Sequence, residues 1–108
     1  MEVVITETAL EDLHDIFVYV AENFYSEKLA HRVIDDLLEA VAPLSDFPHM
    51  GLNAAKKFGR RFIDGVELYV LVVEKNLVWY VILNNELNML RFTNQSQDVA
   101  RLLLKLPE

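Results

Sequence analysis

Apolar residues recur with a helical period over the first half of the chain. Thr8 stands three residues before Glu11, the spacing of a capping box, so we expect a first helix over residues 9–23. A second amphipathic stripe begins after Ser26, a suitable N-cap, and must end before Pro48. Two helices joined by so short a turn form an antiparallel hairpin. The positions expected in its core are Leu13, Ile16, Phe17, Val20, Val33, Leu37, Leu38 and Val41.

After residue 60 the pattern becomes that of strands. Asp64-Gly65 is a strong hairpin-turn signal because both residues tolerate positive φ, and Lys75-Asn76 and Asn84-Asn85 are weaker signals. These turns predict a meander of four strands at residues 60–63, 66–74, 77–83 and 86–93. A brief strand at Val3-Val4-Ile5 and a short helical tail at residues 99–106 complete the predicted elements. We therefore expect one α+β domain over residues 1–108, with the helical hairpin packed on one face of an antiparallel meander.

The two long central strands are apolar at both odd and even positions. Residues 68–73 and 77–83 leave no polar face, whereas an antiparallel sheet with one solvated face should alternate. The helical hairpin can cover only one of the two faces. Either the C-terminal tail covers the other face, or a partner strand or helix does. Both interpretations remain open from the sequence.

Composition and charge narrow the class of protein. The chain of 108 residues has a net charge of −7, which argues against a protein that coats nucleic acid. It has no cysteine, its three histidines lack metal-ligand spacing, and no Gly-rich phosphate loop occurs, so no metal or cofactor is expected. Neither a signal peptide nor an uncharged membrane-spanning run is visible. We expect a cytoplasmic protein that does not bind membranes.

The charge is distributed unevenly. Residues 1–54 carry eleven acids and two bases, a balance of −9, while residues 55–108 carry eight bases and six acids, a balance of +2. Four of the ten bases lie in a basic segment, residues 56–61. The candidate target-binding residues are Lys56, Lys57, Arg60, Arg61 and Arg91. A solvated loop is the alternative for the basic segment, and for Arg91 the alternative is an internal ion pair, for example with Glu67. The acids of the two predicted helices are expected on solvated faces.

Several residues together resemble a known family. Residues 6–23 place an Ala, an Asp-Leu pair, an Ile and a Tyr-Val pair as in the opening of ParE/RelE-superfamily toxins of bacterial type II toxin–antitoxin (plasmid stabilisation) modules. The match continues through Ala30, Leu44, Pro48, Gly51, Val78-Trp79-Tyr80, Met89-Leu90-Arg91 and Asp98. The resemblance implies a toxin restrained by a cognate antitoxin. It also implies an antitoxin segment laid on the sheet, at Leu71, Val73, Trp79 and Val81.

The departures from the family favour one branch of it. RelE-like members cleave mRNA on the ribosome, and this chemistry needs a proton-transfer group and cations at the phosphate. At positions where bases are common, this chain has Glu67, Val81, Asn94 and Gln97. The resemblance therefore implies, first, a ParE-like toxin, which binds DNA gyrase and has no established catalytic centre. A ribosome-dependent endoribonuclease is the second choice.

Two alternatives remain, so whether the chain is an enzyme stays open. As a ribonuclease it would use Arg60, Arg61, Arg91 and Tyr80. The second alternative is a non-toxic family member that acts as an interaction protein.

Overall fold

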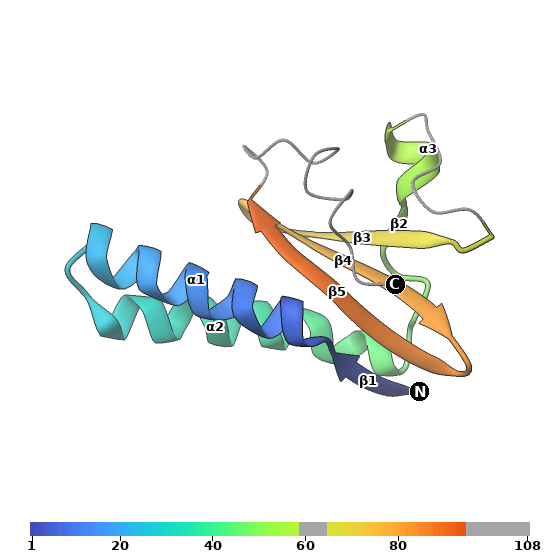
Figure 1. Cartoon of the computed structure of the whole chain (residues 1–108), viewed down its shortest axis with the longest axis horizontal. Helices are drawn as coiled ribbons and strands as arrows, with labels where there is room; N and C mark the ends of the chain where they lie inside the picture. The colour runs from blue at the N-terminus through green and yellow to red at the C-terminus, as the bar shows by residue number, and fades with distance from the viewer. Residues whose placement is uncertain (59–64, 95–108) are drawn as a thin grey trace.

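The chain runs from a short strand into a helical hairpin and then into a meander (Figure 1). The computed structural model describes residues 1–58 and 65–94. Its elements in order are β1 (Glu2–Ile5), α1 (Glu7–Asn23), α2 (Glu27–Val41), the 3₁₀ turn η1 (Ala42–Ser45), β2 (Leu52–Asn53), α3 (Ala54–Phe58), β3 (Leu68–Val73), β4 (Asn76–Leu83) and β5 (Glu86–Asn94). The strand expected at residues 60–63 and the tail expected at residues 99–106 lie outside the described residues.

Helix α1 begins two residues earlier than its apolar stripe suggests. The hydroxyl of Thr6, rather than that of Thr8, caps the helix by accepting a hydrogen bond from the Ala9 N–H at 3.2 Å. Thr6 also donates its own N–H to the Met89 carbonyl at 3.1 Å, so this residue ends the pairing with β5 and starts the helix. The expected N-cap of α2 is confirmed, because the Ser26 hydroxyl accepts from the Leu29 N–H at 3.0 Å.

The five strands form one mixed sheet in the order β1-β5-β4-β3-β2. Strand β1 pairs with β5 in parallel, and the other pairs are antiparallel. The turn at Asn84-Asn85 is confirmed by positive φ values of 51° and 60°. The turn between β3 and β4 lies at Glu74-Lys75, one residue before the predicted pair. Strand β2 escaped sequence analysis because two residues are too few to show an alternating pattern.

Each face of the sheet carries its own apolar cluster. Figure 1 shows the α1–α2 hairpin along one face, with its turn extending beyond the sheet. The cluster on this helix-covered face comprises Ala9, Leu13, Leu37, Val41, Leu44, Tyr69, Val78, Tyr80, Leu87, Met89 and Phe92. The cluster on the other face, here called the second face, comprises Ala54, Leu68, Val70, Leu77, Trp79, Val81 and Leu90. The predicted two-sided burial of the central strands is therefore confirmed.

The expected helical core is correct except at one position. Leu13, Val20, Leu37 and Val41 are buried, and Ile16, Phe17 and Val33 are partly buried. Leu38, however, is 39% exposed, whereas its neighbour Leu37 is 1% exposed. Adjacent helical residues point about 100° apart, so with Leu37 turned into the core Leu38 lies at the edge of the buried face of α2.

This pair of neighbours tests the packing directly. Leu37→Ala should lower the free energy of unfolding by about 2–5 kcal/mol, because it opens a cavity between the helices and the sheet. Leu38→Ala, the matched control, should change it by less than about 1 kcal/mol. Urea denaturation of both variants measures the difference. Equal losses at the two positions would mean that α2 is rotated relative to this packing.

Candidate functional site

Arg91, the target-binding candidate that lies within an apolar strand, forms an ion pair with a carboxylate on α1. Its Nε lies 2.7 Å from Asp12 Oδ2 and its Nη2 lies 2.9 Å from Asp12 Oδ1, a bidentate pair between two largely buried side chains. The hydrogen bond to Asp12 is the main cause that raises the pKa of Arg91 above its ordinary value. The internal pair expected as the alternative therefore exists, but its acid is Asp12. Glu67, the partner suggested from the sequence, bonds Tyr69 instead.

Strand β5 has one extra residue, Leu90, next to this ion pair. The ladder with β4 shifts register here, so that Leu90 is a β-bulge. The bulge reverses the alternation of side chains, and Met89 and Phe92 therefore both reach the helix-covered face. The Phe92 N–H donates to Asp12 Oδ2 at 3.0 Å. Asp12 thus accepts three hydrogen bonds, and the expectation that the helical acids are all solvated is wrong at this residue.

Tyr80 packs in the core, and its hydroxyl both donates and accepts a hydrogen bond. The hydroxyl donates to the Pro48 carbonyl and accepts from the Gly51 N–H, each at 2.9 Å. A Cβ on residue 51 would lie 2.5 Å from this oxygen, so only glycine fits there. Burial raises the pKa of Tyr80.

Tyr69 lies against Tyr80 and continues this aromatic cluster. The two rings stack with centroids 5.4 Å apart, and His49 meets Tyr69 edge-on at 5.5 Å. The Tyr69 hydroxyl donates to Glu67 Oε2 at 2.7 Å. Burial, together with this bond and the charge of Glu67, raises the pKa of Tyr69 to about 12. The sequence offered no signal for this cluster, because its members come from three separated segments.

The basic segment begins in a short helix rather than in a loop. Lys56 and Lys57 lie in the last turn of α3 and are exposed. Arg60 and Arg61 lie outside the described residues. The structure therefore places Lys56 and Lys57 together, while Arg91 lies at the α1–β5 contact, tied to Asp12. The five target-binding candidates do not form one described cluster.

The four residues expected to contact an antitoxin divide between the two faces. Leu71 and Val73 pack against the helix-covered cluster, whereas Trp79 and Val81 belong to the second face. Trp79 and Val81 are also buried within the chain, at 0% and 2% exposure. Because both strands are apolar throughout, the sequence could not reveal which parity faces the helices.

Within residues 1–58 and 65–94, no group of three or more His, Cys, Asp or Glu side chains is placed to hold a metal ion. In the same part of the chain, no helix has the length and apolar character needed to cross a bilayer.

Comparison with known proteins identifies the family. Residues 3–99 match the family model described as the ParE toxin of the type II toxin–antitoxin system parDE. The fold is also similar to a chain of the chromosomal ParDE toxin–antitoxin system from P. aeruginosa, with a TM-score of 0.68 and 20% identity over 87% of this chain and 95% of that chain. No curated protein sequence matches. Given the match over most of its length, the chain belongs to the ParE toxin family.

Removal of the Asp12 charge tests the central ion pair. Asp12→Asn should lower the free energy of unfolding by about 2–4 kcal/mol, because the largely buried Arg91 loses its counter-charge. Asp36→Asn removes an exposed acid from α2 and should change it by about 0.5 kcal/mol or less. Urea denaturation at low salt compares the two variants. A loss at Asp12 no larger than that at Asp36 would show that the pair contributes little to stability.

Tyr69 should make the protein sensitive to alkali. Its pKa is about 12 in the folded chain but about 10 in an unfolded one. This contribution to stability is therefore complete below about pH 10 and is lost as the pH rises to about 12, with a slope of at most about 1.4 kcal/mol per pH unit. Urea denaturation across this range should show a shallower decline for Tyr69→Phe. A decline identical to the wild type would assign the effect to other groups.

Proposed function

We propose that this ParE-family chain acts as a toxin by binding a cellular protein, DNA gyrase in the ParE-like case, and that a cognate antitoxin neutralises it. The observation that carries the proposal is the bonding of Arg91 and Tyr80. Arg91 directs both Nε and Nη2 at Asp12, and the Tyr80 hydroxyl bonds Pro48 and Gly51. These two of the four ribonuclease candidates are thus engaged inside the fold.

Ribonuclease chemistry would need such groups free to meet RNA. A general acid or base must reach the reacting oxygen, and a cation must face the developing charge on the phosphate. Releasing Arg91 for this purpose would leave the Asp12 carboxylate buried without its counter-charge, at a cost of several kcal/mol. Binding through a basic surface requires no such release, and Lys56 and Lys57 are already exposed. We therefore place target binding at the basic segment, residues 56–61.

The sheet half of the chain suits an antitoxin segment. Leu52 and Val72 are 50% and 44% exposed at the β2–β3 edge, beside the second-face residues Val70 and Leu77. We place the antitoxin along this edge, at Leu52 and Val72, because Trp79 and Val81 are already buried within the chain. An acidic segment would be attracted by the balance of +2 in residues 55–108 and repelled by the balance of −9 in residues 1–54. A module of this kind acts in the cytoplasm.

The proposal is tested with purified gyrase and with programmed ribosomes. The wild type should inhibit DNA supercoiling, the antitoxin should relieve the inhibition, and mRNA on ribosomes should remain uncut. Replacing Lys56, Arg60 and Arg61 together by Glu should weaken inhibition roughly tenfold or more, because it reverses the charge of the target-binding segment. Lys28→Glu in the helical half is the control and should have little effect.

Two results would replace this proposal. Cleavage of mRNA at defined codon positions would make the ribosome-dependent endoribonuclease the leading function. A chain that binds its antitoxin but inhibits neither gyrase nor translation would be a non-toxic interaction protein.

A further inference from the structure

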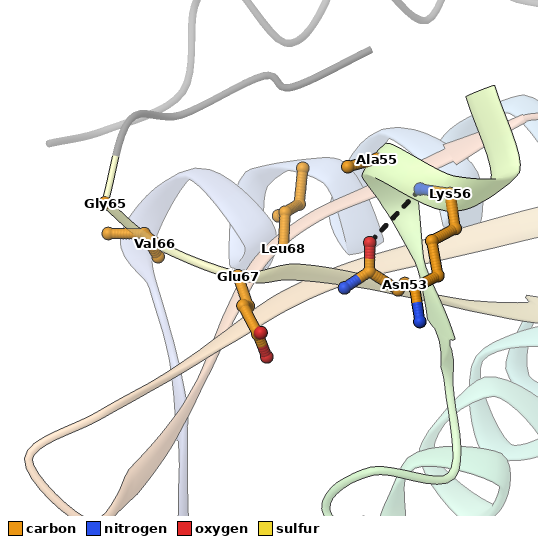
Figure 2. A pocket seen from close by; sticks show the side chains of 7 residues that line it. All are labelled: Asn53, Ala55, Lys56, Gly65, Val66, Glu67 and Leu68. Carbon is orange, nitrogen blue, oxygen red and sulfur yellow. Dashed lines mark hydrogen bonds between the residues drawn. The ribbon is translucent and has the colours of Figure 1, made fainter. Parts of the chain in front are cut away.

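A notch opens at one end of the sheet, where β2 leads into α3 and the chain returns at Gly65 to enter β3 (Figure 2). Asn53, Ala55 and Lys56 line one side of it, and residues 65–68 line the other. Its volume is about 300 Å³, enough for one or two inserted side chains. Strands β2 and β3 pair at only two positions, and their ladder does not extend across the notch.

The apolar part of the lining comes from both sides of the notch and adjoins the second face. Ala55 and Leu68 point toward the same side in Figure 2. Leu68 belongs to the second-face cluster, and Val66 packs against that cluster. A segment running along the β2–β3 edge, where Leu52 and Val72 are exposed, could therefore place an apolar side chain in the notch.

The polar part of the lining, Asn53 and Lys56, offers hydrogen-bond donors. Asn53 uses its Oδ1 to accept the Lys56 N–H at 3.2 Å, which leaves its Nδ2 for another acceptor. Among residues 1–58 and 65–94, neither this Nδ2 nor the Lys56 ammonium has a hydrogen-bond or ion-pair partner. Glu67 does not supply one, because its side chain points away from Leu68 and its Oε2 accepts from Tyr69 at 2.7 Å (Figure 2).

We propose that this notch anchors the inhibitory segment of the antitoxin by taking one apolar side chain together with a neighbouring carboxylate. The inference rests on the proposed function and names the chemistry of its partner. Two donors without acceptors match a carboxylate, and the apolar lining of Ala55, Val66 and Leu68 matches an apolar side chain. A docked carboxylate pairs with Lys56, so the same contact that holds the antitoxin withdraws Lys56 from the target-binding segment.

The experiment measures affinity for the purified antitoxin encoded beside this chain. Asn53→Asp retains the Oδ1 that caps α3 but replaces the Nδ2 donor with a negative oxygen, and Lys56→Glu reverses the charge. Each should weaken binding about 10- to 100-fold, with the loss reduced at high salt. Lys75→Glu makes the same charge change in the turn at the opposite end of β3 and should weaken binding less than about threefold. Thermal melting of all variants establishes that each is folded.

The outcomes separate this inference from the function on which it rests. Selective loss in Asn53→Asp and Lys56→Glu, with recovery of Lys56→Glu binding when one antitoxin acid is changed to Lys, supports the anchor. Unchanged affinity in both variants, or an equal loss in Lys75→Glu, overturns the anchor while antitoxin binding by the wild type stands. A wild type that does not bind the antitoxin at all overturns both the anchor and the proposed neutralisation.

Discussion

The carboxylate of Asp12 joins the two layers of this fold. It accepts two hydrogen bonds from Arg91 and one from the Phe92 N–H, so α1 and β5 are fixed to each other at one point. Thr6 fixes the same two elements a turn and a half earlier, through its bonds to the Met89 and Leu90 carbonyls. With both points held, α1 cannot slide along the strand. The bulge in β5 lies beside this contact, where Phe92 donates its N–H to Asp12 and keeps its side chain in the helix-covered cluster.

This constraint makes Arg91 unavailable for chemistry at the surface of the sheet. Arg91 has the residue type and the strand position that suggest a catalytic cation, yet both of its inward-facing donors serve the helix–sheet contact. A buried pair of this kind is costly to open, because either charge left alone would lack solvation. Chemistry at the sheet would therefore compete with stability. Recognition by exposed groups such as Lys56 does not, so exposed residues away from the Asp12 contact can vary without loosening the layers.

Sequence periodicity predicted the helices and the meander because long, regular segments carry that signal. It located the buried stripe through Leu13 but treated its neighbour Asp12 as solvated, although Asp12 lies only about 100° from the stripe. A cation inside an apolar strand does predict a buried acid, but sequence spacing cannot choose among the acids. Strand β2 and helix α3 are too short for any period. The two faces of β3 and β4 are equally apolar, so the side facing the helices could not be read from them.

The division of charge distinguishes the helical half of the chain from the sheet half. The helices that cover one face carry most of the acids, and the second face lies on the half of the chain with a positive balance. A segment that combines apolar and acidic residues is therefore attracted to the sheet half and repelled from the helices. Lys56, an exposed lysine of α3, lines the same notch as Leu68 at the end of that face. Under the proposed function, target and antitoxin would compete for the same positive charge, and neutralisation would need no conformational change in the toxin.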